Sequence, residues 1–480
     1  MNLQDLFAVP RHRSPDKAAL RFEGRTLSYG ELFAAADRVA AGLRARGLAP
    51  GDRIAFFLGN RPEFVIALLA ALRLGAVVVP MNLAYRRREI LHILGDAEPR
   101  LLLSELSQEP VLEELAPGER PELILAEDLA ALAGDPGPWP LVDGSDLAML
   151  LYTSGTTGKS KGAEITHDNL LATMTGLLAA WAWEADDALL LTLPLFHTHG
   201  LVVGLCCALA AGATVLLRPR FDAAAVASDL LDGEATLFFG VPTMYVRLVE
   251  ELKARGPADL SRMRLFCSGS APLSPETFAA FRDLTGHEIL ERYGMTETGM
   301  NLSNPYAGPR RPGTVGTPLP GVSVRIVEGE LQVRGSNVFS GYWRAPEKTA
   351  ESFVHDESGR RWFRTGDLAH RDPETGYITL LGRRHELILS GGFNVYPREI
   401  EEVLAGYPGI REAAVVGRPH PDRGEVPVAF LVVDAPVDPG ELTAWCKTQM
   451  AGFKVPREIR FVEALPRNAL GKVQKHLLPE

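Results

Sequence analysis

Apolar positions alternate between strand spacing and helix spacing in the first hundred residues. Residues 51–59 read as a buried strand, and the apolar residues of 64–75 recur at helical spacing until Gly75 ends the helix. Asn60, followed by an early Pro and Glu, has the pattern of a helix N-cap. Residues 76–82 supply the next strand. This order predicts one βαβ unit.

The same alternation returns further along the chain. Ser28 and Glu31 predict a capping box, and Ser274 followed by Pro predicts a second helix start. The elements predicted around them are a helix over 32–47, a strand over 264–270, a helix over 271–286 and a strand over 287–294. Repeated βαβ units predict an α/β fold of parallel sheets with helices on both faces, whose ligands lie beyond the carboxyl ends of the strands.

The pattern of predicted elements changes after Gly313. Shorter β-rich segments follow, and the last part of the chain mixes helices and strands with enough apolar positions for a core of its own. We therefore predict a large N-terminal domain over 1–382, built from parallel βαβ sheets plus a small β-rich part. A hinge at 383–385 and a small C-terminal α+β domain over 386–480 complete the expected organisation.

Composition narrows the class of protein. Of 480 residues, 46% are hydrophobic and 23% charged, which is ordinary for a globular protein, and the net charge of -10 argues against nucleic acid or anionic membrane as a main partner. The most apolar run, 201–217, contains two Gly and is predicted to be a buried helix running into a strand. Four Cys without a C-x-x-C pair, and a start without a signal-peptide pattern, predict buried reduced thiols and a cytoplasmic location.

One segment has the composition of a phosphate-binding loop. Residues 153–162, TSGTTGKSKG, contain three Gly, two Lys and five hydroxyl side chains. Glycines allow close backbone approach, and hydroxyls and Lys can bind phosphate oxygens. Thr153 stands where a Walker loop needs Gly, which argues against that motif.

Six segments together resemble the adenylate-forming superfamily of acyl-CoA synthetases, luciferases and peptide-synthetase adenylation domains. They are residues 152–162, 291–298, 362–367, 382–383, 390–397 and 466–472. The resemblance runs from about Leu27 to Leu478. It implies that ATP and a carboxylic acid give an acyl-adenylate and pyrophosphate, with Mg²⁺ present, and that CoA then displaces AMP.

The resemblance also implies which residues bind ATP. These are Thr153, Ser154, Gly155, Thr156, Thr157, Gly158, Lys159, Ser270, Ala271, Glu291, Tyr293, Gly294, Met295, Thr296, Asp367 and Arg383. In the family the loop covers the β- and γ-phosphates. Tyr293 would stack on adenine, Thr296 would contact phosphate and Glu297 would help to hold Mg²⁺, for which a carboxylate is suited. Asp367 and Arg383 would contact the ribose.

Roles in catalysis and CoA binding follow from the same resemblance. The catalytic residues implied are Lys472, Glu297, Thr153 and His197. Lys472 would bridge the carboxylate and the α-phosphate, where a positive charge stabilises the transition state. The small domain would rotate after adenylation about His385 and bring a CoA-binding loop of Ser390, Gly391, Gly392 and Phe393 to the site. His385 could make this switch sensitive to pH, or be a tolerated substitution.

Residues 194–201 and Arg247 indicate which carboxylic acid is the substrate. His197 matches the family's gate between the acyl and thiol sites. His197 and His199 are not expected to bind zinc, because the loop contains no acidic or Cys residue as a further ligand. An Arg247 in the acyl pocket would suit a second carboxylate, because a buried charge needs a partner. Together with residues 195–201, 268–273, 291–305 and 390–401, this segment makes the chain resemble the malonyl-CoA synthetases, which also accept methylmalonate in some cases. His199, Ser270 and Met300 are the further substrate residues that the resemblance implies.

Other readings remain open at this stage. Arg247 could point to solvent, in a medium-chain fatty or aryl acyl-CoA synthetase. The enzyme could also load a carrier protein, or a chain of this type could be a non-catalytic scaffold. The expected partners are a small carboxylic acid, ATP and CoA, without nucleic acid or a membrane span, and the sequence does not report the oligomeric state.

Overall fold

The computed structural model describes residues 1–116, 118–132, 134–135, 137–153, 160–256, 259–390, 393–420, 423–468 and 471–479. They form two compact units. Unit 1 comprises 1–312, 317–323 and 333–363, and unit 2 comprises 313–316, 324–332 and 364–480.

This division differs from the predicted boundary at 383–385. In unit 2 the Glu330 carboxylate accepts hydrogen bonds from Arg364 and from the Gly366 N–H, and it also pairs with Arg384 at 2.9 Å. These bonds tie the segment before the predicted hinge to the segment after it. The position of the hinge at His385 stays a prediction.

The first sheet of unit 1 has six strands in the order β6-β5-β3-β4-β7-β8. Their bounds are β3 Arg53–Phe57, β4 Val77–Pro80, β5 Leu101–Ser104, β6 Glu122–Leu125, β7 Leu147–Thr153 and β8 Lys161–Thr166. Strand β3 pairs in parallel with β4 and β5, and helix α3 (Pro62–Arg73) connects β3 to β4. The predicted βαβ unit is therefore confirmed.

The second sheet of unit 1 has nine strands in the order β15-β14-β13-β12-β11-β9-β10-β1-β2. Their bounds are β1 Ala18–Phe22, β2 Arg25–Ser28, β9 Ala188–Leu191, β10 Thr214–Leu217, β11 Leu237–Gly240, β12 Leu265–Ser268, β13 Ile289–Met295, β14 Gly299–Ser303 and β15 Thr317–Pro318. The predicted strands near 264–270 and 287–294 are β12 and β13, which pair in parallel. Residues 201–217 form the predicted helix running into a strand, here a π-helix (His199–Cys206), α7 and β10.

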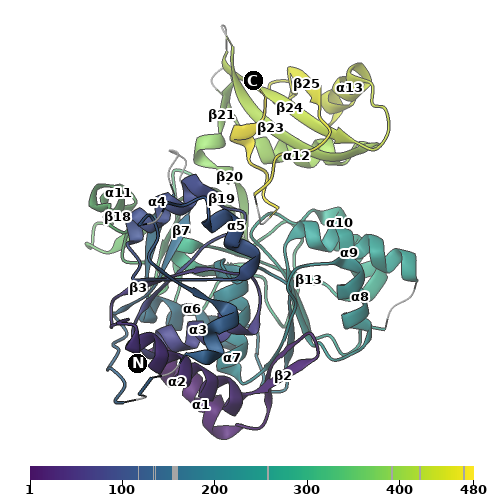
Figure 1. The fold of residues 1–480 in the computed structure, drawn as a ribbon. Coiled ribbons are helices and arrows are strands. Elements are labelled where there is room, and N and C mark those ends of the chain that lie inside the picture. The colour runs from purple at the N-terminus through teal and green to yellow at the C-terminus, as the bar shows by residue number, and fades with distance from the viewer. Residues whose placement is uncertain are drawn as a thin grey trace. The chain divides into compact units, whose positions relative to one another are not determined.

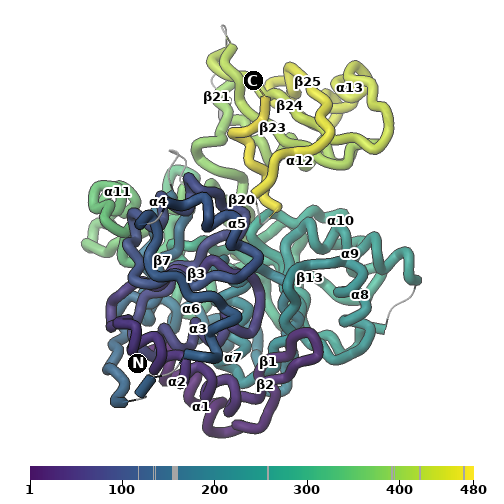
Figure 2. The backbone as a smooth tube through the Cα atoms, in the orientation of Figure 1, coloured from purple at the N-terminus to yellow at the C-terminus, as the bar shows by residue number. Residues whose placement is uncertain are grey.

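Helices cover these sheets, and several of their ends match the sequence. Besides α3, the α-helices of unit 1 are α1 Leu3–Arg13, α2 Tyr29–Ala45, α4 Arg87–Ala97, α5 Glu109–Leu112, α6 His167–Ala180, α7 Cys207–Ala211, α8 Ala223–Leu231, α9 Pro242–Arg255, α10 Pro275–Thr285 and α11 Pro346–Glu351. Ser28 and Glu31 form the predicted capping box of α2, and Ser274 caps α10. Helices α8, α9 and α10 lie together (Figure 1), and α1, α2 and α3 gather near the N-terminus (Figure 2).

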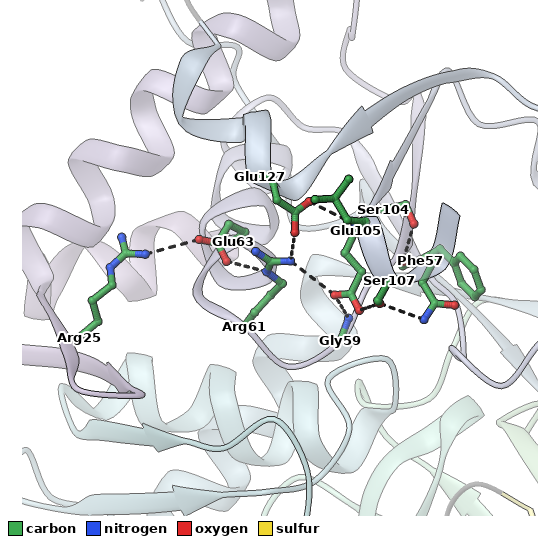
Figure 3. A network of polar contacts seen from close by, with 11 residues as sticks. Arg25, Phe57, Gly59, Arg61, Glu63, Ser104, Glu105, Ser107 and Glu127 are labelled. Atoms are coloured by element: carbon green, nitrogen blue, oxygen red, sulfur yellow. Dashed lines mark hydrogen bonds and ion pairs between the residues drawn. The ribbon is translucent and has the colours of Figure 1, made fainter. Parts of the chain in front are cut away.

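The start of α3 differs from the prediction. Its N-cap is Arg61 rather than Asn60, and the Arg61 guanidinium pairs with Glu63 at 2.7 Å and Glu127 at 2.6 Å (Figure 3). The Asn60 side chain instead bonds to the Leu193 carbonyl, which follows a strand of the second sheet. The sequence pattern therefore placed the N-cap one residue before its actual position. The Asn60 side chain cannot cap the helix because it is hydrogen-bonded to a residue far along the chain.

Unit 2 ends in a small sheet with helices against it. The strands of this sheet are β21 Ile388–Ser390, β22 Phe393–Val395, β23 Ile410–His420, β24 Gly424–Val433 and β25 Glu458–Phe461, and its helices are α12 Pro397–Ala405 and α13 Pro439–Gln449. The chain also forms the earlier strands β16 Ser323–Val327, β17 Glu330–Arg334, β18 Phe353–His355, β19 Arg361–Arg371 and β20 Ile378–Arg383. The sheet order is β22-β21-β24-β23, with β25 beside β24 (Figure 1). A core including Ile388, Leu431 and Leu442 is buried between the sheet and the helices, which confirms the predicted separate core.

Two further predictions can be compared with the structure. All four Cys are free and buried, as expected. Within the described residues no helix is both long and apolar enough to cross a membrane. The cytoplasmic location stays a prediction.

Candidate active site

The end of β7 and the segment after β13 meet in unit 1. Thr153 closes β7, and its hydroxyl lies 3.5 Å from Oε1 of Glu297, a weak hydrogen bond at most. The loop positions Ser154, Gly155, Thr156, Thr157, Gly158 and Lys159 lie outside the described residues. Thr153 and Glu297, two of the residues implied for catalysis, are thus neighbours in space, although 144 positions separate them.

Glu297 is a buried carboxylate among hydroxyl groups. The Tyr342 hydroxyl donates to its Oε1 at 2.9 Å, and the Phe339 N–H donates to its carbonyl at 2.8 Å. Among the described residues, no group of three or more His, Cys, Asp or Glu side chains could hold a metal ion alone. A single carboxylate with neighbouring hydroxyls fits Mg²⁺, which takes most of its ligands from phosphate and water.

Strand β13 sends its side chains to opposite faces. The Glu291 carboxylate accepts the Leu273 N–H at 3.2 Å, and it thereby fixes the turn that carries Ser270 and Ala271. Tyr293 is buried, with its hydroxyl 3.8 Å from Sδ of Met295. Gly294 and Met295 complete β13, and Thr296 begins the 3₁₀ turn that carries Glu297. The residues of this motif that are implied for ATP therefore follow one another directly along the chain.

Arg292 is the feature of this strand that the sequence analysis missed. Its guanidinium is buried, and among the described residues its Nε and Nη2 have no hydrogen-bond partner. A Cβ at Gly269 would lie 2.5 Å from its Cζ, so the guanidinium fits only because position 269 is Gly. The Cys267 thiol is its hydrogen-bonding neighbour. Arg292 is thus a desolvated cation with two N–H groups available for an anion.

The two histidines implied for the acyl site lie near this cation. Nδ1 of His199 is 3.4 Å from the Ser270 hydroxyl, and Ser270 has a φ of 69°, in the left-handed region that side chains rarely adopt. Burial and the charge of Arg292 lower the pKa of His197 to about 4 and the pKa of His199 well below its usual value. Both imidazoles are therefore neutral at physiological pH, and Arg292 supplies the positive charge. Met300 is buried and packs against Gly294.

The lowered pKa of His197 predicts a pH-dependent stability. The unfolded chain takes up a proton near pH 6.5, whereas the folded chain keeps this imidazole neutral down to about pH 4. The free energy of unfolding is therefore expected to fall as the pH falls through that interval. Chemical denaturation of His197→Gln should show a smaller fall than the wild type. Identical pH dependence in the two proteins would show that His197 is not the titrating group.

Arg247 does not occupy the expected buried position. It lies on the exposed face of α9, with its guanidinium carbon 5.2 Å from the centroid of the Phe221 ring. The expected burial of Arg247 is therefore wrong, and its pairing with a substrate carboxylate stays a prediction that the structure does not test. The buried Tyr245, Leu248 and Leu252 define the inner face of this helix, and Arg247 is not on it.

Unit 2 brings together the two residues implied for the ribose. Asp367 on β19 faces Arg383 on β20, and Nε of Arg383 lies 2.8 Å from Oδ1 of the buried Asp367. Loss of hydration and the charge of Arg383 lower the pKa of Lys472, while Asp367 and Glu386 act in the opposite direction. Lys472, which is exposed, therefore lies close enough to Arg383, Asp367 and Glu386 for their charges to act on it.

The remaining residues of unit 2 lie at its β21–β22 turn and next to it. Ser390 is buried, and the ring of the exposed Phe393 stacks on Phe453 with centroids 4.4 Å apart. Gly391 and Gly392 lie outside the described residues. At the predicted hinge, Nε2 of His385 is 4.0 Å from Glu386, and partial burial is the main cause that lowers the pKa of His385. The CoA and hinge roles stay predictions.

Comparison with known proteins identifies the family. Residues 7–343 match the family model described as AMP-binding enzyme, and residues 399–472 match the AMP-binding enzyme C-terminal domain. The chain belongs to the AMP-binding enzyme family. It is 37% identical over 495 residues to a feruloyl-CoA synthase of Amycolatopsis sp, a match that covers 99% of this chain and 98% of the relative.

Two further relatives of this AMP-binding enzyme agree with that assignment. A mitochondrial malonate–CoA ligase of Bos taurus is 34% identical over 519 residues, covering 96% of this chain and 87% of the relative. The crystal structure of ATP-bound MatB from Rhodopseudomonas palustris has a TM-score of 0.92 at 41% identity, covering 99% of this chain and 98% of that one. The chain is accordingly an ATP-dependent acyl-CoA ligase of the adenylate-forming type, with CoA as co-substrate.

Proposed function

We propose that this acyl-CoA ligase activates malonate, and in some degree methylmalonate, and transfers it to CoA. The observation that carries the proposal is the buried Arg292 with two unpartnered N–H groups beside the implied acyl residues. A buried charge without a counter-charge costs several kcal/mol, so Arg292 would favour a substrate that brings a second anion. Malonate is a short dicarboxylic acid that can bring one carboxylate to Arg292 and keep the other for activation.

The proposed reaction has two steps. In the first, a malonate carboxylate oxygen attacks the α-phosphorus of ATP, and the bond to the β-phosphate oxygen breaks to release pyrophosphate. In the second, the CoA thiolate attacks the carbonyl carbon of malonyl-adenylate, and AMP leaves with the bonding electron pair. Glu297 is the candidate ligand for Mg²⁺, which would neutralise phosphate charge when bound.

The residues of the chain divide between these steps in the proposal. Lys472 holds the attacking carboxylate and the α-phosphate, where its ammonium opposes the charge that develops on phosphorus. Asp367 and Arg383 orient the ribose, and Tyr293 packs on the adenine. The neutral His197 separates the acyl site from the thiol site, and the turn that contains Ser390 and Phe393 guides CoA after a rotation at His385.

The alternative substrate class is an aryl or medium-chain acid. The identity to a feruloyl-CoA synthase supports the aryl alternative, whereas a neutral acyl group would leave the Arg292 guanidinium buried without a counter-charge. The neutral histidines offer no replacement for that counter-charge. Arg292 therefore favours malonate over ferulate, octanoate or benzoate.

A screen of acids for pyrophosphate release in the presence of ATP and CoA tests the proposal. Malonate and methylmalonate should give the highest kcat/KM, and sulfoacetate, which carries a sulfonate as its second anion, should give an intermediate value. Butyrate, octanoate, benzoate and ferulate should each be at least roughly 10²-fold poorer, since they leave Arg292 unpaired. A preference for ferulate or octanoate with no release from malonate would replace the proposal by the alternative.

A further inference from the structure

Asn60 connects the two sheets of unit 1 by three hydrogen bonds. Its side-chain Nδ2 donates to the carbonyl of Leu193 at 2.9 Å and to the carbonyl of Arg218 at 3.1 Å. Its Oδ1 accepts the N–H of Leu195 at 2.9 Å. The side chain is 7% exposed, so these bonds form away from solvent. Asn60 follows β3 of the first sheet, whereas its partners follow β9 and β10 of the second.

The turn that carries Asn60 is fixed on both sides. The Gly59 N–H donates to the Glu105 carboxylate at 3.1 Å, and the Arg61 guanidinium lies 3.7 Å from the same carboxylate (Figure 3). Glu63 pairs with Nε of Arg61, and Glu127 pairs with Nη1, the nitrogen that also faces Glu105. A charged network on both neighbours leaves the Asn60 backbone little freedom, so its amide is a fixed point on the first sheet.

The segment that Asn60 holds leads directly to the acyl residues. The His197 N–H bonds to the Pro194 carbonyl at 3.3 Å. A Cβ at Gly200 would lie 2.4 Å from the Pro194 oxygen and 2.9 Å from the Leu193 oxygen, so the start of the π-helix packs tightly on these carbonyls. His199 begins that π-helix. Any displacement of the Leu193 and Pro194 carbonyls therefore moves both histidines.

We infer that Asn60 is a positioning residue for the acyl site. It acts through the Leu193–Leu195 segment and sets where His197 and His199 stand relative to Ser270. The inference goes beyond the proposed function and does not depend on malonate being the acid, because it concerns the backbone that carries the two histidines. It would hold equally for an aryl substrate.

The test replaces Asn60 by Asp, which has nearly the same shape. The new carboxylate still accepts from Leu195, but it faces the Leu193 and Arg218 carbonyls without a hydrogen, so like partial charges repel. The KM for the best acid of the screen should rise about tenfold, the size expected for loss of the buried hydrogen bond to the Leu193 carbonyl, while the KM for ATP stays within about twofold. Lowering the pH should narrow the gap to wild type, because protonation of the introduced carboxyl group restores a donor.

Asn169 offers a matched control. It is 8% exposed, its Nδ2 donates to the carbonyls of Ser336 and Val338, both at 2.9 Å, and its Oδ1 accepts the Thr166 N–H at 3.0 Å. Asn169→Asp therefore breaks the same kind of bonds elsewhere in unit 1. It should lower the melting temperature in a similar way and leave the KM for the acid unchanged.

The possible outcomes separate positioning from general stability. An acid KM that rises only in Asn60→Asp supports the inference. It is overturned if the acid KM is unchanged, if the KM values for acid and ATP rise together, or if Asn169→Asp gives the same rise. Asn60→Ala is measured in parallel, and failure of both Asn60 variants to fold would also overturn it, because Asn60 would then stabilise the whole unit. Failure of the malonate proposal appears in the acid screen instead.

Discussion

Replacement of Lys472 by Ala is expected to slow acid-dependent pyrophosphate release by roughly 10²- to 10³-fold, the loss typical for one charge-stabilising group in a transition state. The ammonium is proposed to oppose the negative charge that develops as the carboxylate attacks the α-phosphate. The measurement is ATP–pyrophosphate exchange with malonate in the absence of CoA, which reports the first step alone.

The second step supplies the internal comparison for Lys472. Malonyl-adenylate given directly to the variant with CoA should yield malonyl-CoA at nearly the wild-type rate. Lys447→Ala, at an exposed position of α13 in the same unit, should leave both steps unchanged. Equal losses in the two half-reactions of Lys472→Ala would remove Lys472 from its proposed role.

Arg292→Ala is expected to have the second large effect, on the choice of acid. Removal of one partner of a buried ion pair costs roughly 3–5 kcal/mol, which corresponds to a fall of roughly 10²- to 10⁴-fold in kcat/KM for malonate. The kcat/KM for butyrate, which brings no second charge, should fall little or even rise. The measurement is kcat/KM for malonate and butyrate at saturating ATP and CoA.

Arg247→Ala is the matched control for that experiment. Arg247 is also an arginine of unit 1, yet it is exposed and lies over the Phe221 ring. Its replacement should change kcat/KM for neither malonate nor butyrate, since an exposed cation at this position has no buried partner to lose. If the two variants lowered kcat/KM for malonate and butyrate in parallel, the distal carboxylate would not be bound by Arg292.

The sequence predicted the fold well where local signals agree with the tertiary structure. The capping box at Ser28, the cap at Ser274 and the helix running into a strand over 201–217 all appear as expected, because their signals are local hydrogen bonds and periodicity. Asn60 failed as a cap since Leu193 and Leu195, far along the chain, compete for its amide. Such a competition cannot be read from a single stretch of sequence.

The two arginines show what the sequence could and could not give of the site. Helix α9 buries Tyr245, Leu248, Val249 and Leu252, at helical spacing, so periodicity alone would have placed Arg247 outside. Arg292 had a signal too, since a charged residue inside a buried strand needs an explanation. Its proximity to the turn at Gly269 depends on the parallel pairing of β12 with β13, which no local pattern specifies.

The central claim is that a second anion of the acid pairs with the buried Arg292, and it is tested most directly by a crystal structure with an unreactive malonyl-adenylate mimic. The distal carboxylate should lie at roughly 2.7–3.2 Å from Nε and Nη2 of Arg292, the range of an N–H···O hydrogen bond. A distal carboxylate bound by other residues, with Arg292 contacting only protein or water, would contradict the proposal.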